Sequence, residues 1–190
     1  MATLKLFMVL LGGKPEGRHT EQHDMFFGIA AKLQDLADDF VTFWPELKNK
    51  MHIDCWREVT QVDGYDVHVL PASESGKETQ LFFLNLGGYK PGDFEEYHYK
   101  MIVAATEKSK AVQSAKQTAF FRHYSFEGAT SHIDDKYGID VDDIYEIKDI
   151  LPERLKSRYS LVLRPAQEKR EDPLHIGYLK MERLKKGILD

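Results

Sequence analysis

The chain lacks several features that would assign it to a common class of protein. Cys55 is its only cysteine, so no internal disulfide and no cysteine-rich zinc site can form. No apolar run approaches the roughly 18 residues that a membrane helix needs. The formal net charge is −5 with both signs mixed along the chain, so no basic stripe is present to neutralise nucleic-acid phosphates. These absences predict a soluble protein of a reducing compartment, the cytoplasm, with neither a membrane nor a nucleic acid as its partner.

Motifs that define a reaction are also missing. The sequence has no G-x-S-x-G nucleophile elbow, no H-E-x-x-H zinc motif and neither of the common glycine-rich nucleotide-binding patterns. Cys55 stands near Asp54 and Glu58, whose negative charge disfavours a thiolate, so the cysteine is expected to be a packing residue. The sequence therefore leaves open whether the protein is an enzyme.

The chain does contain an internal repeat. When residues 6–30 are placed on residues 81–105 without a gap, nine of the 25 positions are identical. The shared positions include Leu-Phe, Leu-Gly-Gly and Glu-x-His, in the same order and at the same spacing. Such self-similarity is typical of a duplicated unit. The sequence thus predicts a tandem duplication, with repeat units at 1–71 and 80–151, a linker at 72–79 and a C-terminal extension at 152–190.

Each unit is expected to be a β-α-β-β arrangement in an α/β protein. The apolar run 4–11, stopped by Gly12-Gly13, predicts a buried strand. Apolar residues spaced three and four apart then predict a helix that begins near Glu21. The Asp63-Gly64 pair between two alternating segments predicts a β-hairpin. The stripe of the predicted helix comprises Phe26, Ile29, Ala30, Leu33, Leu36, Ala37 and Phe40.

The second unit is expected to follow the same plan. Residues 80–86 predict its first strand, and Asp93 to Glu96 predict the cap of a helix that continues to Val112. Residues 131–134 match 51–54, and residues 142–147 match the hairpin segment 62–67. Because each unit alone is small for an independent core, the two are expected to share one continuous mixed sheet or to form two sheets about a pseudo-two-fold axis.

Shorter segments complete the expected secondary structure. Residues 40–44 and 118–121 are expected to be extended. The C-terminal extension predicts a short helix at 152–157 and strands at 159–164 and 174–181. The extension has no counterpart in the first unit, so we expect it to cover an exposed edge of a sheet.

The order of these motifs resembles a known family. Leu-Gly-Gly, a loop, Glu-x-His, His-Ile-Asp and an Asp-Gly-Tyr hairpin are similar to a bacterial domain of unknown function that occurs in one or two copies per protein. The resemblance covers both units and ends before the C-terminal extension. It implies no activity, cofactor or substrate. The second copy departs from the pattern, because Asp24 becomes Tyr99 and the Asp63-Gly64 turn becomes Asp143-Ile144.

Polar residues recur at matching places in the two units. Glu21 and His23 stand at the start of the first predicted helix, and His98 stands at the start of the second. His52 and Asp54 are two apart on a predicted strand, where alternate side chains share one face. His132 and Asp134 repeat that spacing. Residues two apart on a helix point to nearly opposite sides, so Glu21 and His23 converge only if Glu21 lies in the preceding loop.

These residue types suit a metal ion. Two imidazoles and a carboxylate can bind a first-row divalent transition metal. The candidate metal ligands are His23, His52, Asp54, His98, His132 and Asp134. In a metal-assisted hydrolase, Glu21 and His23 would be the candidate catalytic residues, with Glu21 as the general base. The structural alternative stays open, because a histidine on an apolar face is commonly a hydrogen-bonded core residue.

The paired glycines offer a further possibility. The free amides at a helix N-terminus can hold an anion or the phosphate of a cofactor. Gly12, Gly13, Gly87 and Gly88 precede the two predicted helices and are the candidate cofactor-binding residues. The alternative is that they only permit a sharp turn.

Three functions therefore remain open. The first is a non-catalytic binding or interaction module whose histidines are mainly structural. The second is the metal-assisted hydrolase, and the third is an anion-binding protein. The sequence identifies no substrate or partner, and a homo-oligomer is compatible with it.

Overall fold

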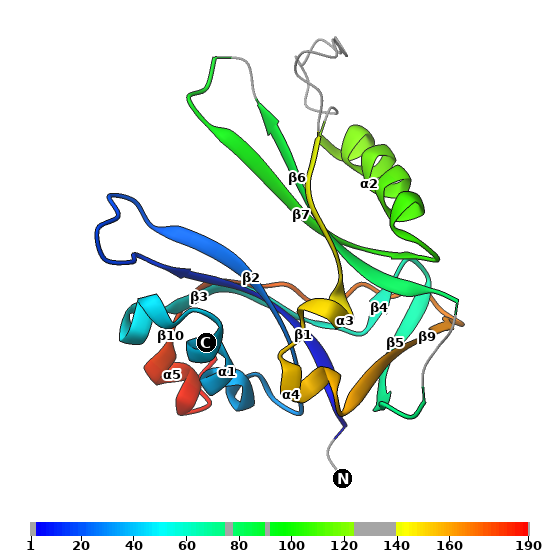
Figure 1. The fold of residues 1–190 in the computed structure, drawn as a ribbon, viewed down its shortest axis with the longest axis horizontal. Coiled ribbons are helices and arrows are strands. Elements are labelled where there is room, and N and C mark those ends of the chain that lie inside the picture. Colours follow the sequence, from blue (N-terminus) through cyan, green and yellow to red (C-terminus); the bar gives the residue numbers. More distant parts are fainter. Residues whose placement is uncertain (1–2, 75–77, 90–91, 124–139, 190) are drawn as a thin grey trace. The chain divides into compact units, whose positions relative to one another are not determined.

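The structure is a computed structural model that describes residues 3–74, 78–89, 92–123 and 140–189. These residues form an α/β protein with ten strands in three antiparallel sheets, five α-helices and two short 3-10 helices (Figure 1). The chain divides into two compact units. Unit 1 comprises residues 1–75 and 150–190, and unit 2 comprises residues 76–149.

Unit 1 is built on a four-stranded sheet with the order β10-β3-β1-β2. The strands are β1 (Lys5–Gly13), β2 (Gln22–Ala30), β3 (His52–Val59) and β10 (His175–Lys180). The strand predicted at 4–11 is confirmed as β1. Phe7, Val9 and Leu11 are buried on one face, and Leu6 is buried on the other, where Met8 and Leu10 are half-buried. This burial on both faces explains the continuous apolar run in the sequence.

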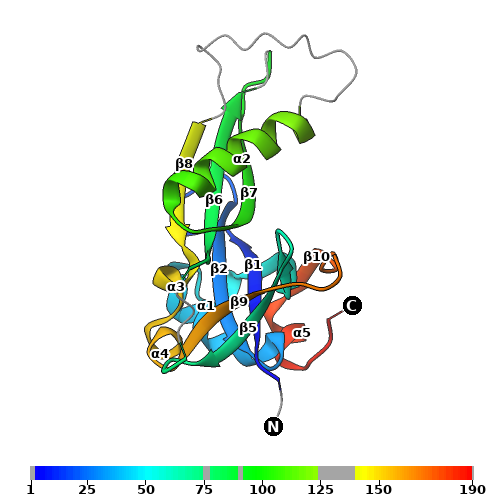
Figure 2. The same cartoon turned by 90° about the vertical axis from the view of Figure 1, so that its right-hand side faces the viewer.

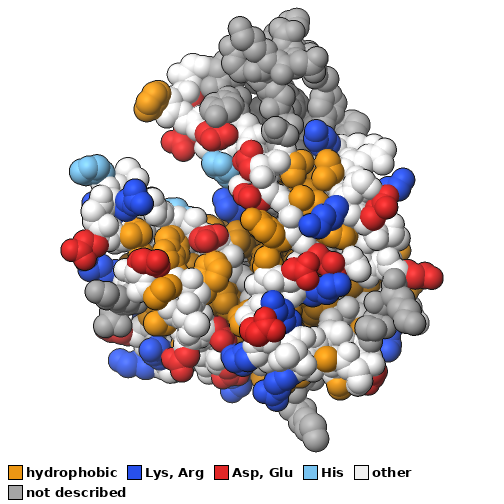
Figure 3. Space-filling model, viewed as in Figure 1, with side chains coloured by type: hydrophobic (Ala, Val, Ile, Leu, Met, Phe, Trp, Pro, Cys, Tyr) orange, Lys and Arg blue, Asp and Glu red, His pale blue; other side chains and the backbone are white. Residues whose placement is uncertain are grey.

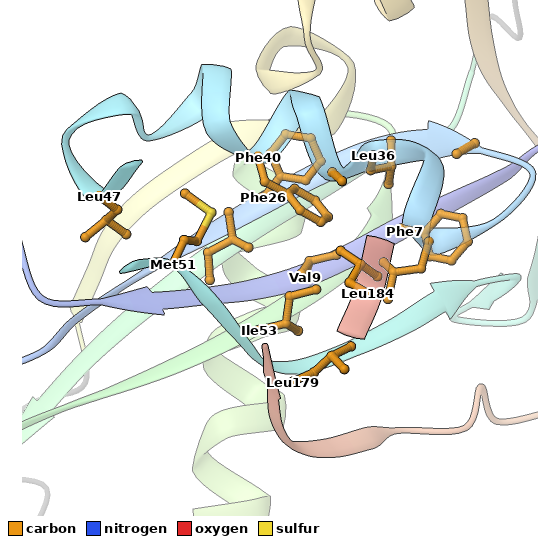
Figure 4. Packing of buried hydrophobic residues seen from close by; sticks show 14 residues of the cluster. Phe7, Val9, Phe26, Leu36, Phe40, Leu47, Met51, Ile53, Leu179 and Leu184 are labelled. Carbon is orange, nitrogen blue, oxygen red and sulfur yellow. The ribbon is translucent and has the colours of Figure 1, made fainter. Parts of the chain in front are cut away.

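The main core of unit 1 lies on one face of this sheet. Four helical segments supply its other wall: η1 (Leu33–Leu36), α1 (Ala37–Phe43), η2 (Pro45–Lys50) and α5 (Met181–Lys185). Figure 4 shows apolar side chains of the sheet and the helices meeting in the space between them. The fully buried members include Phe7, Val9, Leu11, Phe26, Leu36, Phe40, Ile53 and Leu184. Removing this apolar surface from water is the main force that fixes β1 and its neighbours in place.

A second sheet of unit 1 contains β4 (Gln61–Val62), β5 (Tyr65–Pro71) and β9 (Tyr159–Pro165). Figure 2 shows β9 beside β5, and the two strands pair antiparallel. The predicted Asp63-Gly64 hairpin is confirmed, because these two residues connect β4 to β5. Both have a positive φ, 49° at Asp63 and 81° at Gly64, as a type I′ turn requires.

Hydrogen bonds tie the C-terminal segment to this hairpin. Thr60 donates its backbone N–H to Asp172 Oδ2 at 2.9 Å. Gln61 Nε2 and Arg170 both donate to Asp66 Oδ1 at 3.0 Å. The hydrogen bonds from Gln61 and Arg170 hold the pKa of the Asp66 carboxyl below its usual value. The loop before β10 is therefore held by Thr60 and Asp66 through its residues Asp172 and Arg170.

The short helix and both strands predicted in the C-terminal extension are present. They are α4 (Glu153–Lys156), β9 and β10, preceded by α3 (Ile147–Ile150). The extension covers a sheet edge as expected, since β10 pairs antiparallel with β3. Arg154 of α4 binds the buried Asp39 of α1 with two groups, of which Nε donates to Oδ1 at 2.8 Å. This ion pair raises the pKa of the Arg154 guanidinium above its usual value.

The described residues of unit 2 include a three-stranded sheet and a long helix. The sheet has the order β7-β6-β8, with β6 (Gln80–Tyr89), β7 (Glu96–Ala105) and β8 (Asp140–Glu146). Helix α2 (Lys108–His123) buries Ala111 and Ala115 against this sheet. The apolar partners of these alanines include Phe82, Leu84, Leu86 and Val103.

Both helices predicted after the Leu-Gly-Gly motifs are wrong, because these segments are strands. Residues 25–30 of β2 are all buried, which one face of a helix could not achieve. The supposed helical stripe in fact crosses the end of β2, η1 and α1. In unit 2 the segment Glu96–Ala105 is β7, and its tyrosines and β-branched residues favour a strand.

Four smaller expectations are also wrong. Residues 40–44, expected to be extended, lie mainly in α1, and residues 118–121 lie in α2. The described strands form three antiparallel sheets instead of one continuous mixed sheet. The β-α-β-β order fails as well, because β1 and β6 are each followed directly by an antiparallel partner strand.

Two properties of the described residues concern binding partners. None of their helices is long and apolar enough to cross a membrane. Figure 3 shows basic and acidic side chains interspersed over one face of the molecule.

The Arg154–Asp39 pair generates a stability prediction. In the variant Arg154→Ala, the buried Asp39 carboxylate loses its charged donor. We expect the free energy of unfolding to fall by about 1–3 kcal/mol, the usual cost of leaving a buried polar group unsatisfied. The corresponding loss in Tm is a few degrees for a chain of this size, measurable by differential scanning calorimetry.

Lys156→Ala is the matched control. Lys156 lies on the same helix but pairs with an exposed glutamate, Glu153, at 2.8 Å. An exposed pair of this kind contributes at most about 1 kcal/mol. Equal destabilisation by the two variants would contradict the role given to the Arg154–Asp39 pair.

Candidate metal centre

Four side chains that can bind a metal meet at one end of the unit 1 sheet. Glu21 directly precedes β2, His23 lies on β2, and His52 and Asp54 lie on β3. One ligand atom from each lies within 4.8 Å of all the others. The sequence placed these four residues in one candidate site, and the structure brings them together.

The strand conformation of β2 explains why Glu21 and His23 converge. Successive side chains of a strand alternate between its two faces, so residues two apart point to the same side. The helical reading had placed them on nearly opposite sides. Correcting the secondary structure therefore strengthens the site, because Glu-x-His is the right spacing for two ligands on a strand.

A β-bulge directs Asp54 into the cluster. Leu10 pairs with Cys55 and Leu11 pairs with Ile53, so Asp54 is the extra residue of β3 opposite β1. A bulge of this kind re-aims a side chain and interrupts the regular alternation. Strand β10 bulges at the same level, because Gly177 and Tyr178 lie between its pairs with Cys55 and Ile53.

Gly12 leaves the space in which the side chains meet. Strand β1 lies between β2 and β3, and Gly12 pairs with His23 on one side and with His52 on the other. A β-carbon at Gly12 would lie 2.5 Å from His52 Nε2 and would also overlap Asp54 Oδ2. The sequence expectation that Gly12-Gly13 precede a helix is wrong, so the anion site that needed a helix N-terminus has no basis there.

The cluster contains more acceptors than donated protons. His52 Nε2 lies 2.6 Å from Glu21 Oε1 and 3.3 Å from Asp54 Oδ1, although a ring nitrogen carries at most one proton. His23 Nε2 lies 3.2 Å from Asp54 Oδ2. That oxygen is buried and accepts no well-directed hydrogen bond within the described part of the chain. A cation at this place would satisfy oxygens that the two imidazoles leave incompletely paired.

The distances suit a small divalent ion. Ligand atoms bound tetrahedrally at about 2.0–2.1 Å, as around Zn²⁺, lie roughly 3.3 Å apart. The separations of 3.2 and 3.3 Å lie near this value, whereas the 2.6 Å between His52 Nε2 and Glu21 Oε1 is the length of a direct hydrogen bond. To bind an ion among the four groups, the contact between His52 and Glu21 would have to open.

The site is closed on one side and open on the other. The His52 side chain is only 5% exposed, whereas those of His23 and Glu21 are 44% and 45% exposed. The Tyr178 ring of β10 covers His52, with ring centroids 4.2 Å apart. Sequence reasoning missed Tyr178, because only the pairing of β10 with β3 brings it to the site.

Unit 2 carries a similar but smaller cluster. Glu96 and His98 of β7 and Asp142 of β8 offer three ligand atoms within 4.8 Å of one another. His98 Nε2 lies 3.4 Å from Asp142 Oδ2. A β-carbon at Gly87 would overlap the Asp142 carboxylate, as one at Gly12 would overlap that of Asp54.

The sequence missed Asp142 because it aligned the second unit incorrectly. It matched Asp142 with Val62 of the hairpin, whereas β8 pairs with β6 in the way that β3 pairs with β1. In this register Asp142 corresponds to Asp54. The predicted ligands His132 and Asp134 lie outside the described residues.

The other two candidate glycines do not contact the clusters in any described way. A β-carbon at Gly13 would meet the Leu47 side chain at 2.8 Å, so Gly13 faces the core. Gly88 lies on β6 and pairs with Tyr97 of β7.

The role of Gly12 can be tested by adding a single methyl group. In the variant Gly12→Ala the new β-carbon displaces the His52 imidazole and the Asp54 carboxylate from each other. We expect the affinity for Zn²⁺ to fall by about tenfold or more, since metal sites depend on precise ligand orientation. Isothermal titration calorimetry of both proteins would measure the change.

Gly64→Asn is the control substitution. Gly64 has open space where a β-carbon would be added, and asparagine tolerates its positive φ. Unchanged zinc affinity in this variant would show that a larger side chain at a glycine distant from the cluster does not by itself weaken zinc binding. Unchanged affinity in Gly12→Ala would contradict the packing role of Gly12.

Comparison with known proteins supports the fold. The chain is similar to the protein Il1583 from Idiomarina loihiensis in its crystal structure, with a TM-score of 0.63 and 24% sequence identity. The similarity covers 94% of this chain and 97% of that one. At this identity the likeness shows the fold alone. No curated protein matches the chain.

A family model matches the part of the chain that carries the first cluster. Residues 18–69 match the family described as Domain of Unknown Function (DUF1543). This segment includes all four residues of the cluster, from Glu21 to Asp54. The resemblance to a domain of unknown function that the motifs indicated is thus confirmed for residues 18–69, which are similar to the DUF1543 family.

Proposed function

We propose that this protein is a metal-binding module and that unit 1 binds one first-row divalent transition metal ion. The ligands would be Glu21, His23, His52 and Asp54. The observation that carries the proposal is the convergence of two imidazole Nε2 atoms and two carboxylates over a glycine, with fewer protons than acceptors. Imidazole and carboxylate together suit Zn²⁺, Mn²⁺ and related ions.

The principal alternative is a purely structural cluster. His52 is buried beneath Tyr178, and its short contact with Glu21 could simply tie β2 to β3. Two features favour a ligand site over this reading. The buried Asp54 Oδ2 lacks a directed donor within the described residues, and His23 is nearly half exposed on the side open to solvent. A structural network normally satisfies its buried members.

Purification without added metal, followed by elemental analysis and a thermal-shift titration, tests this proposal. We expect about one transition metal ion per chain, or a rise in Tm when Zn²⁺ or Mn²⁺ is added to protein treated with chelator. A ligand at about 100 times its Kd stabilises the folded state by about 2.7 kcal/mol. This corresponds to roughly 5–10 °C for a chain of this length.

His23→Ala and His19→Ala form a matched pair for the same measurement. His23 is partly exposed, so its loss should leave the metal-free protein folded while removing most of the metal-induced shift. His19 is exposed in the loop before β2 and lies outside the cluster. The proposal is wrong if wild-type protein shows neither bound metal nor a thermal shift, or if the two variants respond equally.

Metal-assisted hydrolysis is the second candidate function, and the position of Glu21 favours it. Its carboxylate is 45% exposed at the open side of the cluster, where a substrate and water have access. A bound divalent ion would supply Lewis acidity. Glu21 would then accept a proton from water as a general base, while His23, His52 and Asp54 hold the ion.

A pair of Glu21 variants separates catalysis from binding. We expect Glu21→Gln to retain metal yet to lose at least about 100-fold in metal-dependent hydrolysis, measured with p-nitrophenyl acetate and bis(p-nitrophenyl) phosphate. Glu21→Asp should regain part of the rate. If metal-loaded wild-type protein hydrolyses neither substrate, the hydrolase proposal is wrong. The proposal of a metal-binding module would be unaffected.

We also propose that the two units derive from a duplication of the three-strand motif. Residues 6–30 and 81–105 share nine of 25 positions at an offset of 75. The bulge between Leu10 and Leu11 recurs between Asn85 and Leu86, at the same offset. Superposition of β1, β2 and β3 on β6, β7 and β8 tests this origin. A best fit in a different register would contradict it.

A further inference from the structure

The cluster of unit 2 is built by the same device as that of unit 1. Asn85 pairs with Asp143 and Leu86 pairs with Val141, so Asp142 is the extra residue of a β-bulge. Gly87 of the central strand pairs with His98, and the Asp142 carboxylate occupies the space that a side chain at Gly87 would need. A bulged aspartate, a glycine and a histidine from the neighbouring strand thus recur together.

The ligands of the two clusters differ in one respect. Unit 1 offers two imidazoles and two carboxylates, whereas the described cluster of unit 2 offers one imidazole and two carboxylates. The strand register identifies the missing group. Gly12 pairs with His52 in unit 1, and Gly87 pairs with Asp140 in unit 2. The position that holds the buried histidine in unit 1 therefore holds an aspartate in unit 2.

The surroundings of the two clusters differ as well. In unit 1 the Tyr178 ring of β10 covers His52. In unit 2 Glu96, His98 and Asp142 are all exposed, and β8 pairs only with β6 among the described strands. Fewer ligands among the described side chains and their greater exposure leave more coordination positions for water or for a ligand from solution.

We propose that unit 2 holds a second cation site, formed by Glu96, His98 and Asp142, that discriminates less between Zn²⁺ and Mn²⁺ than the site of unit 1 does. Imidazole nitrogen favours Zn²⁺, whereas oxygen ligands and water suit harder ions such as Mn²⁺ and Mg²⁺. Loss of one imidazole therefore lowers the affinity for Zn²⁺ more than the affinity for Mn²⁺. The two sites would bind different ions when both metals compete.

The test counts and identifies bound ions in the full chain. Two variants each remove one site: Glu21→Ala combined with His23→Ala for unit 1, and His98→Ala for unit 2. Electron paramagnetic resonance would count bound Mn²⁺, and competition with Zn²⁺ would give the affinity ratio at each site. Circular dichroism and the Tm without metal would verify that both variants fold, and His19→Ala is the control for loss of an exposed histidine.

We expect wild-type protein to bind two Mn²⁺ ions per chain at saturation and each variant to bind one. The variant Glu21→Ala with His23→Ala reports the site of unit 2, and His98→Ala reports the site of unit 1. The Zn²⁺-to-Mn²⁺ affinity ratio should be about tenfold smaller for the site of unit 2 than for the site of unit 1. Asp142→Asn should reduce binding in unit 2 as His98→Ala does, which guards against a local unfolding effect of the histidine change.

The possible failures are distinguishable from failure of the site in unit 1. If wild-type protein binds one ion and the variant Glu21→Ala with His23→Ala binds none, unit 2 has no cation site. The proposed site of unit 1 would then still be supported. If His98→Ala still binds two ions, the second ion lies elsewhere and the proposal is overturned. Equal affinity ratios at the two sites would overturn the claimed difference in selectivity.

Discussion

The candidate centre depends on the absence of a side chain at Gly12. This residue lies on the strand between β2 and β3, and the side chains of the cluster come from those two neighbours. Side chains of neighbouring strands ordinarily stand beside the side chain of the strand between them. Without a β-carbon at Gly12, His23 from one side and His52 and Asp54 from the other can lean over the central backbone and meet. Gly87 leaves the same space beside Asp142 in unit 2.

The rigidity of the cluster comes from the opposite face of the same strands. Leu11 precedes Gly12, Ile53 precedes Asp54, and both apolar side chains are fully buried in the main core. Residues three apart on a regular strand point to opposite sides, yet Ile53 and Trp56 both pack on the core. The bulge in β3 makes this possible, because it adds one residue between them. Asp54 is the residue that the bulge releases toward the other face. Core packing therefore positions the ligands, which gives a more precisely held site than a loop would.

The sequence indicated which residues of unit 1 lie close together better than it indicated the fold. His-x-Asp at a spacing of two correctly indicated a shared face, and Asp63-Gly64 correctly indicated a hairpin because the positive φ of both residues is a local requirement. The segments after the two Leu-Gly-Gly motifs were misread as helices. In β2 the buried positions 25–30 form an unbroken run, and its accidental continuation into η1 and α1 mimicked a helical period. Tyr178 and Asp142 were beyond local patterns, since their places follow from the pairing of strands far apart in sequence.

The sequence indicated the residues on the first two strands of each sheet more clearly than those on the third strand. The reason is the length of chain that connects the strands. In each unit the glycine and the Glu-x-His motif belong to two strands that follow each other in the chain, β1 and β2 or β6 and β7. The short connection between such strands keeps their residues in a fixed register. These residues recur at a constant offset. The third strand reaches each sheet only after a long connection, whose described elements are η1, α1 and η2 in unit 1 and α2 in unit 2. The bulge identifies Asp142, because this residue lies between the partners of Asn85 and Leu86. The candidate ligand on such a strand is therefore identified by the hydrogen-bond register of the strand in its sheet. That register can be read from the folded structure but not from local sequence patterns.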